Sequence, residues 1–252
     1  MKNSEFCYCL ITGAAGGIGL ALASAFTDAG YKVVATDISA RPATLHSAYF
    51  IRADLDRVVN DEAYAQIIFG QIRHCLNGVG LKALINNAAI QIIGAAESLT
   101  REDWHKTLDV NLLAPFLFAQ AFLPDLEKAK GCVINITSIH AEHTKRNFVA
   151  YATSKAALSG LTRSMAVDLG GRVRVVGIEP AAIDTAMLRA GFQNDPVGYQ
   201  QLNGLHPLGR IGRPDEVARL ALAVSDGGMD FLNGVCVQLN GGISARLVDP
   251  VA

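Results

Sequence analysis

Residues 10–26, LITGAAGGIGLALASAF, join an apolar strand pattern to an amphipathic helix pattern through a turn rich in glycine. Gly13, Gly17 and Gly19 follow the spacing G-x-x-x-G-x-G. A turn without Cβ atoms can bend tightly and lets the backbone approach a phosphate at the N-terminus of the helix. The stretch therefore predicts a strand–turn–helix unit, whose turn is either purely structural or binds phosphate.

Further strand patterns alternate with helical patterns along the chain. The apolar, β-branched runs lie at residues 6–12, 31–37, 48–54, 82–88, 131–138, 172–178 and 233–239. This alternation predicts a parallel, doubly wound sheet of about seven strands with helices on both faces. The link 38–47 is short and contains Pro42, so we expect only a stunted helix there. No repeat or linker divides the chain, and residues 1–252 are expected to form one domain.

The segment 184–214 differs from the rest of the chain. Glycine, proline and scattered polar residues interrupt the strand–helix alternation there. A long connection inside a compact domain usually has a function. We therefore expect it to be a substrate-binding loop or lid.

Composition limits the classes of function. The chain is 50% hydrophobic and 18% charged, with a formal net charge of −1. This balance predicts a large core and argues against nucleic acid or an anionic membrane as partner. Residues 1–5 leave no room for the apolar stretch of a signal peptide, and no apolar run has membrane-spanning length. The five scattered cysteines include no C-x-x-C pair, so we expect no zinc or redox site and a cytoplasmic location.

An acidic residue ends the second strand pattern. Asp37 lies in the window where a carboxylate binds the ribose hydroxyls of a dinucleotide and repels a 2′-phosphate. No Arg or Lys occupies Ala14, Ala15 or Ile38. NAD(H) is therefore favoured as cofactor, while the nearby Arg41 leaves NADP(H) open.

Several motifs occur in one order along the chain. They are Thr12-Gly13-x-x-x-Gly17-x-Gly19, Asn86-Asn87-Ala88-Ala89, Asn111, Ser138, Tyr151-x-x-x-Lys155 and Pro180. Together they resemble the single-domain branch of the short-chain dehydrogenase/reductase family, from about residue 6 to about residue 243. The resemblance implies a Rossmann-type domain and an oxidoreductase of alcohols and ketones. Each motif alone is of low specificity, but their joint order and spacing are highly specific.

The resemblance also implies roles for residues at matching positions. Ser138, Tyr151, Lys155 and Asn111 would be catalytic, with Asn111 positioning a water near the lysine. Cofactor contacts would come from Gly13, Gly17, Ile18, Gly19, Asp37, Asp54, Leu55, Asn87, Ala88, Tyr151, Lys155, Pro180, Ile183 and Thr185. Three residues depart from the family pattern, namely Ala89 and Ala181, where glycine is usual, and Asn240, where aspartate is common.

The spacing of Tyr151 and Lys155 fits proton transfer. On a helix these side chains lie one turn apart on the same face. A free tyrosine ionises near ~10, so we expect the lysine and an oxidised nicotinamide to lower the pKa of this phenol. Ser138 would hydrogen-bond the same substrate oxygen.

The substrate side is predicted more coarsely. The run 138–148, SIHAEHTKRNF, places His140 and Glu142 after the serine, an arrangement similar to that of bacterial sugar dehydrogenases of this family. These two residues and Met187 are the candidate substrate contacts, and a sugar or small hydroxy acid is the expected substrate. A solvated loop is the structural alternative for the charged residues. A non-catalytic NAD-binding regulator or scaffold is the alternative function.

Two helical patterns carry apolar and small residues on more than one face. They cover residues 103–126 and 151–169. A helix that is apolar beyond one stripe is often buried against a second element. In related proteins these helices pair subunits, commonly into tetramers, so we expect a homo-oligomer, a tetramer or dimer. Burial within one subunit is the alternative.

Overall fold

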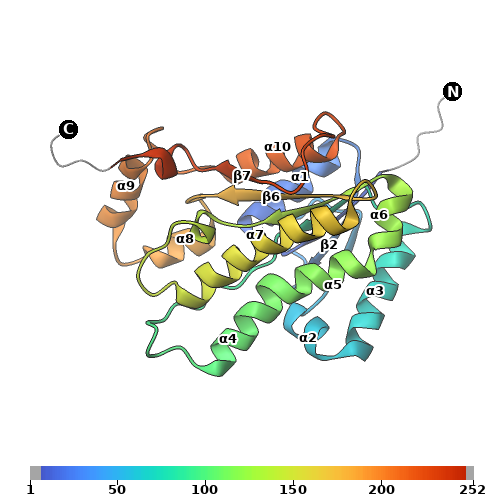
Figure 1. The fold of residues 1–252 in the computed structure, drawn as a ribbon, viewed down its shortest axis with the longest axis horizontal. Helices are drawn as coiled ribbons and strands as arrows, with labels where there is room; N and C mark the ends of the chain where they lie inside the picture. The colour runs from blue at the N-terminus through green and yellow to red at the C-terminus, as the bar shows by residue number, and fades with distance from the viewer. Residues whose placement is uncertain (1–6, 248–252) are drawn as a thin grey trace.

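Seven parallel strands form one sheet in the order β3-β2-β1-β4-β5-β6-β7 in the computed structural model, which describes residues 7–247 (Figure 1). The strands are β1 (Tyr8–Thr12), β2 (Lys32–Asp37), β3 (Tyr49–Arg52), β4 (Ala83–Asn86), β5 (Cys132–Ile136), β6 (Arg174–Pro180) and β7 (Cys236–Leu239). The seven predicted strands and the parallel, doubly wound topology are confirmed, except that Phe6 lies outside the described residues. The strand order reverses between β1 and β4, where ligands of such sheets bind.

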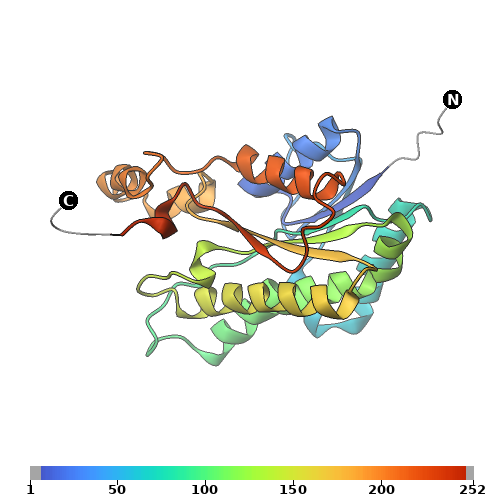
Figure 2. The same cartoon turned by 45° about the horizontal axis from the view of Figure 1, so that its top comes forward.

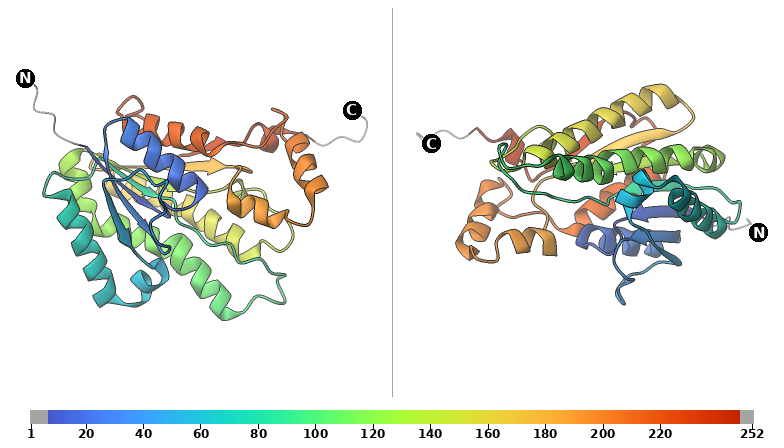
Figure 3. Two further views of the ribbon diagram at one scale, coloured as in Figure 1. Left: turned by 180° about the vertical axis from the view of Figure 1, so that it is seen from behind. Right: turned by 90° about the horizontal axis from the view of Figure 1, so that it is seen from below.

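Helices cover both faces of this sheet. The helical elements are α1 (Gly17–Asp28), α2 (Leu55–Asn60), α3 (Glu62–Leu76), α4 (Arg101–Leu108), η1 (Asp109–Leu113), α5 (Ala114–Ala121), α6 (Leu123–Ala129), η2 (Ile139–Ala141), α7 (Val149–Leu169), α8 (Ala186–Gly191), α9 (Pro196–Leu205), α10 (Pro214–Ser225) and η3 (Ile243–Ala245). Figure 2 shows α1 and α10 on one side of the sheet and α5 and α7 on the other. The views from behind and below in Figure 3 show the same layers.

Each face of the sheet has its own apolar core. Leu22 and Phe26 of α1 pack with Val217 of α10 on one face, and all three side chains are fully buried. Phe118 of α5 and Ile72 of α3 belong to the core on the other face. Burying one such side chain contributes about 2 kcal/mol. Both faces of the central strands are thus covered, which explains why β1 and β5 are largely apolar and are buried along their whole length.

One predicted segment differs from expectation, and a second contains two helices. Residues 38–47 form no helix, because Pro42 interrupts the link and Leu45 is instead buried against the core of α1 and α10. The segment 184–214 contains α8 and α9, which lie together at one end of the molecule (Figure 1). Side-chain caps start both helices: Thr185 accepts from the amide of Leu188, and Asp195 accepts from that of Gly198.

Candidate active site

The glycine turn joins β1 to α1 at the carboxyl end of the sheet. Gly13 has φ of +64°, and a Cβ there would lie 2.6 Å from the Cα of Ala88, just after β4. A Cβ on Gly19 would lie 2.1 Å from the main-chain oxygen of Gly13. Neither position can take a larger residue without displacing backbone. Gly13 and Gly19 are therefore required by the closeness of β1, β4 and α1.

A network of hydrogen bonds fixes this turn to the end of β4. The Thr12 hydroxyl accepts from the amides of Asn87 and Ala88, each at 3.1 Å. The side-chain amide of Asn87 donates to the main-chain oxygens of Thr12, at 3.0 Å, and Gly13, at 2.9 Å. Asn87 and Ala88 thus lie against the turn, and Asn87 holds its backbone in place.

Helix α1 begins at Gly17, directly after Gly16 of this turn. Its first turn contains Gly17, Ile18 and Gly19, with no acidic residue and no side-chain cap. The helix dipole and the first amides of a helix attract anions. With glycine backbone beside it, this end of the twelve-residue helix fits the pyrophosphate of a dinucleotide.

The carboxylate of Asp37 is held in place at the end of β2. Its two oxygens accept from the amides of Ala15 and Ser39, each at 2.9 Å. A carboxylate has about four acceptor sites, so it can also accept from ribose hydroxyls. Arg41, the residue that leaves NADP(H) open, donates to the main-chain oxygen of Ser47 at 2.9 Å.

Asp54 and Leu55 follow the third strand. Asp54 caps α2 by accepting from the amides of Asp56, at 3.1 Å, and Arg57, at 3.4 Å. Leu55 is buried. Both residues lie at the carboxyl edge of the sheet, beyond β3, and their contact with an adenine ring stays a prediction.

Ser138 and Tyr151 meet where β5 and α7 come together. Ser138 is buried, and its hydroxyl accepts from the amide of His140 at 3.1 Å. The Tyr151 phenol lies close enough to Ser138 for this side chain to affect its pKa. Burial raises the pKa of this phenol, and its interaction with Ser138 opposes the increase. The fold thus brings the two hydroxyls together. The sequence predicted a lowered pKa for Tyr151, but in the protein without cofactor this pKa is raised.

Lys155 is buried beside Tyr151 on α7. Its side chain is 2% exposed, and its Nζ donates to the main-chain oxygen of Ile136 at 2.8 Å. The Nζ lies 5.8 Å from the centre of the Tyr151 ring. Burial lowers the pKa of Lys155 to about 8. The lysine can therefore lose its positive charge at mildly alkaline pH. Its hydrogen-bond acceptor is a main-chain oxygen and not a carboxylate.

Asn111 lies in η1, a π-helical turn between α4 and α5. Its oxygen accepts from the amide of Ile90 at 2.8 Å, and its amide nitrogen donates to the Ile90 oxygen at 2.9 Å. The same nitrogen donates to the Ser154 hydroxyl at 3.0 Å, next to Lys155 on α7. Such π-turns often mark functional sites. The structure thus ties the fully buried Asn111 to α7, while its role in positioning a water stays a prediction.

His140 lies beside the tyrosine in an aromatic cluster. Its ring centre is 4.7 Å from that of Phe148 and 6.0 Å from that of Tyr151. Burial, and then the charge of Lys145, lower the pKa of His140 below its ordinary value. The imidazole is therefore neutral at pH 7 and can exchange hydrogen bonds with a hydroxylated ligand. Sequence reasoning missed Phe148, because only the fold places its ring next to that of His140.

The other two candidate substrate contacts differ in their surroundings. Glu142 accepts from the side-chain amide of Gln238 on β7 at 3.1 Å. Met187 is 57% exposed in the first turn of α8. The structure thus places Glu142 against the C-terminal strand and leaves Met187 at the surface of the 184–214 segment.

The start of the 184–214 segment lies over the glycine turn. A Cβ on Gly17 would lie 2.9 Å from Cγ2 of Thr185. The preceding Ile183 is buried and forms a β-bridge with Gly212. Pro180, the buried last residue of β6, leads into this connection. The residues predicted to border the nicotinamide are therefore brought next to those predicted to hold the phosphates.

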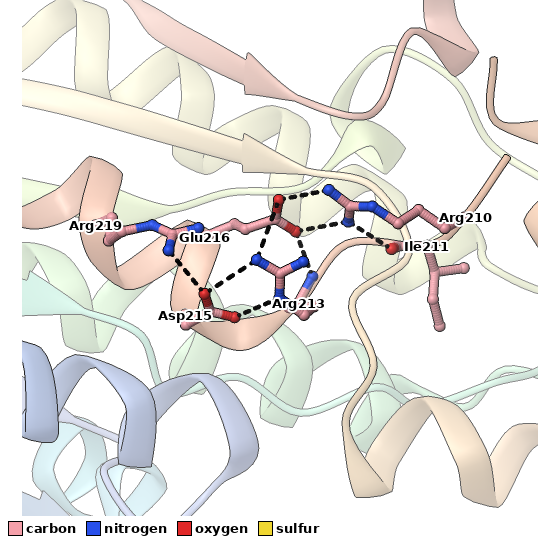
Figure 4. A network of polar contacts seen from close by, with 6 residues as sticks. All are labelled: Arg210, Ile211, Arg213, Asp215, Glu216 and Arg219. Atoms are coloured by element: carbon pink, nitrogen blue, oxygen red, sulfur yellow. Dashed lines mark hydrogen bonds and ion pairs between the residues drawn. The ribbon is translucent and has the colours of Figure 1, made fainter. Parts of the chain in front are cut away.

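Charged residues fasten the far end of this segment to α10 (Figure 4). The guanidinium of Arg210 donates to both carboxylate oxygens of Glu216, at 2.8 and 2.7 Å. This fork lowers the pKa of Glu216 to about 2. Arg213 and Arg219 both pair with Asp215, at 2.9 and 3.1 Å. The connection from α9 to α10 is thus anchored at its C-terminal end.

The departures from the family pattern fit this chain. Neither Ala89 nor Ala181 has a φ in the left-handed region, so a Cβ adds no backbone strain at either position. The amide nitrogen of Asn240 donates to the Gln238 oxygen at 3.2 Å. An aspartate at 240 would lack this donor.

Comparison with known proteins identifies the family of this chain. A family model described as enoyl-(acyl carrier protein) reductase matches residues 13–244. The chain is 31% identical over 251 residues to D-threitol dehydrogenase of Mycolicibacterium smegmatis, covering 94% of this chain and 92% of that protein. The chain belongs to the short-chain dehydrogenase/reductase family. It is accordingly an oxidoreductase of alcohol or ketone substrates, in a family that binds nicotinamide cofactors.

Solved structures of related enzymes have the same fold. The ligand-free aldohexose dehydrogenase of Thermoplasma acidophilum superposes with a TM-score of 0.87 at 30% identity, covering 97% of each chain. A 4-hydroxyisoleucine dehydrogenase complexed with NADH gives a TM-score of 0.84 at 26% identity, covering 96% of this chain and all of the other. The Rossmann-type architecture is thus shared over nearly the whole chain.

Residues 7–247 contain no metal-binding cluster and no single helix able to cross a membrane. Over that range no group of three or more His, Cys, Asp and Glu residues could hold a metal ion. All five cysteines are free thiols. No single described helix is long and apolar enough to cross a membrane, and only the bent pair Arg101–Ala121 and Leu123–Ala129 meets that test when taken together.

Proposed function

We propose that this protein is an NAD(H)-dependent oxidoreductase that interconverts a secondary alcohol and a ketone on a small polar substrate, with Tyr151 as general acid and base. The observation that carries the proposal is the convergence of Ser138, Tyr151 and Lys155. The Ser138 hydroxyl acts on the pKa of Tyr151, and the Lys155 ammonium lies one helical turn away, hydrogen-bonded to the end of β5.

The residues of the site fit a dinucleotide along the carboxyl edge of the sheet. The amides of Gly17, Ile18 and Gly19 would hold the pyrophosphate, and Asp37 the adenosine ribose. The remaining cofactor contacts would come from Gly13, Asp54, Leu55, Asn87, Ala88, Tyr151, Lys155, Pro180, Ile183 and Thr185. When bound, the nicotinamide ring supplies or accepts the hydride.

The chain's own residues handle the proton. Ser138 donates a hydrogen bond to the substrate oxygen and keeps it beside the Tyr151 phenol. In the reductive direction Tyr151 donates its proton to that oxygen, and in the oxidative direction it accepts one. Lys155, whose pKa is lowered to about 8, then exchanges a proton with Tyr151. Asn111 would position the water that completes the exchange with solvent.

Asp37 favours NAD(H) over NADP(H). Its carboxylate is oriented by two backbone amides, and a 2′-phosphate beside it would meet like charge. Related structures hold NADH in one case and NADP in another, so the choice depends on residues of this chain. The backbone contact of Arg41 supports the same preference.

The polar substrate is supported by the groups around the tyrosine. His140 is neutral at pH 7, since burial lowers its pKa, and can bond a substrate hydroxyl. Glu142 and Met187 would contribute further contacts, with residues 184–214 as the loop or lid that covers the substrate. The names of two relatives, a threitol and an aldohexose dehydrogenase, point to hydroxylated substrates as well. A sugar is favoured over a hydroxy acid on this basis.

We also propose a homo-oligomer, a tetramer or dimer, in the cytoplasm as a single 1–252 domain. Leu113 of η1 and Phe116 of α5 are 41% and 37% exposed, and Val149 of α7 is 38% exposed. These are apolar side chains on or beside the helices that the sequence predicts to pair. Free thiols are typical of a reducing compartment.

A substrate panel tests the proposed function. Sugars, polyols, hydroxy acids and steroids are offered with NAD and NADP while nicotinamide absorbance is followed. We expect turnover of a hydroxylated substrate with NAD, and a loss of about 10²- to 10⁴-fold in kcat for Tyr151→Phe with NADH binding retained. Turnover of steroids alone would overturn the polar substrate. Cofactor binding without any turnover would favour the non-catalytic regulator or scaffold.

A further inference from the structure

Glu179 is a buried acid that the proposed chemistry does not use. It is the next-to-last residue of β6, it is 1% exposed, and its Oε1 has no hydrogen-bond partner within residues 7–247. An unpaired carboxylate is costly in such a place. Burial, and then the charge of Glu142, raise the pKa of Glu179 to about 7. A neutral carboxyl group is therefore favoured below neutral pH.

The surroundings of Glu179 contain little positive charge. In the sheet it is paired with Gln238 of β7, whose amide donates to Glu142 at 3.1 Å. Cys236, also on β7, interacts electrostatically with Glu179, and burial raises the pKa of this thiol so that it stays neutral. Arg163 of α7 acts on Cys236 from an exposed position. The charged group acting most strongly on Glu179 is thus another carboxylate.

Glu142 belongs to the loop that carries Ser138 and His140. The bond from Gln238 to Glu142 ties this loop to β7. The Gln238 oxygen in turn accepts from Asn240, at 3.2 Å, and Ser244, at 3.0 Å. A second negative charge behind Glu142 would repel it and work against this chain of hydrogen bonds.

We propose that Glu179 is a positioning residue that acts in its neutral form, leaving Glu142 as the single negative charge at this place and so keeping the Ser138–Glu142 loop in register beside Tyr151. Ionisation of Glu179 at alkaline pH adds a second negative charge next to that of Glu142 in the loop and weakens substrate binding. The effect on substrate binding rests on the proposed function, whereas the interaction of the two carboxyl groups does not.

The interaction is tested by thermal unfolding without cofactor between pH 5 and pH 8.5. The pKa of Glu179 is higher in the folded state than in the unfolded state. The contribution of Glu179 to stability is therefore complete below its unfolded-state pKa and is lost as pH rises through about 7. We expect the Tm of wild type to fall relative to Glu179→Gln by on the order of 5 °C over this range.

The variant Glu142→Gln removes the negative charge that acts on Glu179. Without the carboxylate at position 142, the pKa of Glu179 should be raised less, because only burial then acts on it strongly. The decrease in Tm with rising pH should therefore end at a lower pH than in wild type and be smaller in total.

A matched control is Glu62→Gln, at an exposed position of α3. Helix α3 packs near β3, at the opposite edge of the sheet from β7. This variant should keep the pH dependence of wild type. Parallel Tm curves for wild type and Glu179→Gln would overturn the proposal, as would a Glu142→Gln curve identical to that of wild type. If Glu179→Gln does not fold, the Glu142→Gln comparison still decides the matter.

Kinetics test the positioning role. With a substrate found by the panel, KM of wild type should rise about tenfold between pH 6 and pH 8.5, as Glu179 passes from neutral to ionised. Glu179→Gln should lack this rise, with kcat following wild type across the range. A defect in both kcat and KM that is the same at every pH would show a merely structural role and overturn the proposal. If no substrate is found, the proposed function fails while the Tm curves still decide whether the two carboxyl groups interact.

Discussion

The ammonium of Lys155 donates a 2.8 Å hydrogen bond to the main-chain oxygen of Ile136. This bond links α7 to the last residue of β5, two residues before Ser138. It holds the lysine near the tyrosine of the same helix, with its Nζ 5.8 Å from the ring centre. The relative position of Tyr151 and Lys155 is therefore set by the contact between a helix and a strand end.

The same burial predicts how the stability of the protein depends on pH. The folded-state pKa of Lys155 is lowered to about 8, below its unfolded value. The wild-type protein should therefore gain stability as pH rises above 8, because the buried lysine loses its charge. Between pH 8 and pH 9.5, its free energy of unfolding should rise by about 2 kcal/mol relative to Lys155→Met. Denaturant unfolding of both proteins measures the difference.

Lys106→Met is the control for this measurement, since Lys106 is exposed on α4. Its free energy of unfolding should stay parallel to that of wild type. A constant difference between wild type and Lys155→Met at all pH values would contradict a lowered pKa at Lys155.

Gly19→Ala should disrupt the phosphate-binding turn. The new Cβ would lie 2.1 Å from the Gly13 oxygen, so the turn must shift. We expect a loss of about 2–3 kcal/mol in the free energy of unfolding and weaker NADH binding. In Gly16→Ala the nearest atom is 3.6 Å from the Cβ, and the stability should change by less than about 1 kcal/mol. Equal losses in the two variants would show that the close approach at Gly19 is not the cause.

Thr12→Val should separate the roles of the Thr12 hydroxyl and its methyl group. The hydroxyl accepts from two backbone amides, of Asn87 and Ala88. Without it these amides lose a partner, at a cost of about 2–4 kcal/mol in the free energy of unfolding. Thr12→Ser keeps the oxygen and should lose about 1 kcal/mol. Denaturant unfolding that ranks Ser at or below Val would rule out this role for the hydroxyl.

Asp37→Ala should change cofactor preference. Removing the carboxylate removes charge-assisted hydrogen bonds to the ribose, which corresponds to a roughly ten- to hundredfold rise in the Kd for NADH. The Kd for NADPH should change less, because repulsion of the 2′-phosphate is removed as well. Fluorescence titration with both cofactors measures this, with the exposed Asp28→Ala as control. An equal weakening for both cofactors would argue against a ribose contact.

The strands and their ends were predictable because local patterns specify them. The runs ending at Thr12 and Asp37 are apolar and β-branched, and parallel strands bring their carboxyl ends to one edge of the sheet. The glycine turn was predictable for a similar reason, since its spacing reflects a backbone conformation. Local signals for the α8 and α9 caps, Thr185 and Asp195, were also present in the sequence, but the glycine and proline residues around them obscured the helices.

Other features depend on contacts between distant parts of the chain. The π-turn at Asn111 is stabilised by Ile90 and Ser154, and no periodicity predicts it. The raised pKa of Tyr151 follows from burial, which a spacing of four residues cannot reveal. In the same way, Glu179 looks like an ordinary strand residue until β7 and Glu142 are placed around it.

The sequence by itself thus determined the sheet, the glycine turn and the order of Ser138, Tyr151 and Lys155, because each depends on residue type at short spacing. Only the tertiary structure decided how these groups are charged and held. Burial lowers the pKa of Lys155, and the interaction with Ser138 opposes the rise in the pKa of Tyr151. Burial at the end of β6 also leaves Oε1 of Glu179 without a hydrogen-bond partner within residues 7–247. The physical reason is that solvation and electrostatic interactions depend on every neighbour in space, whereas local conformation depends mainly on neighbours along the chain.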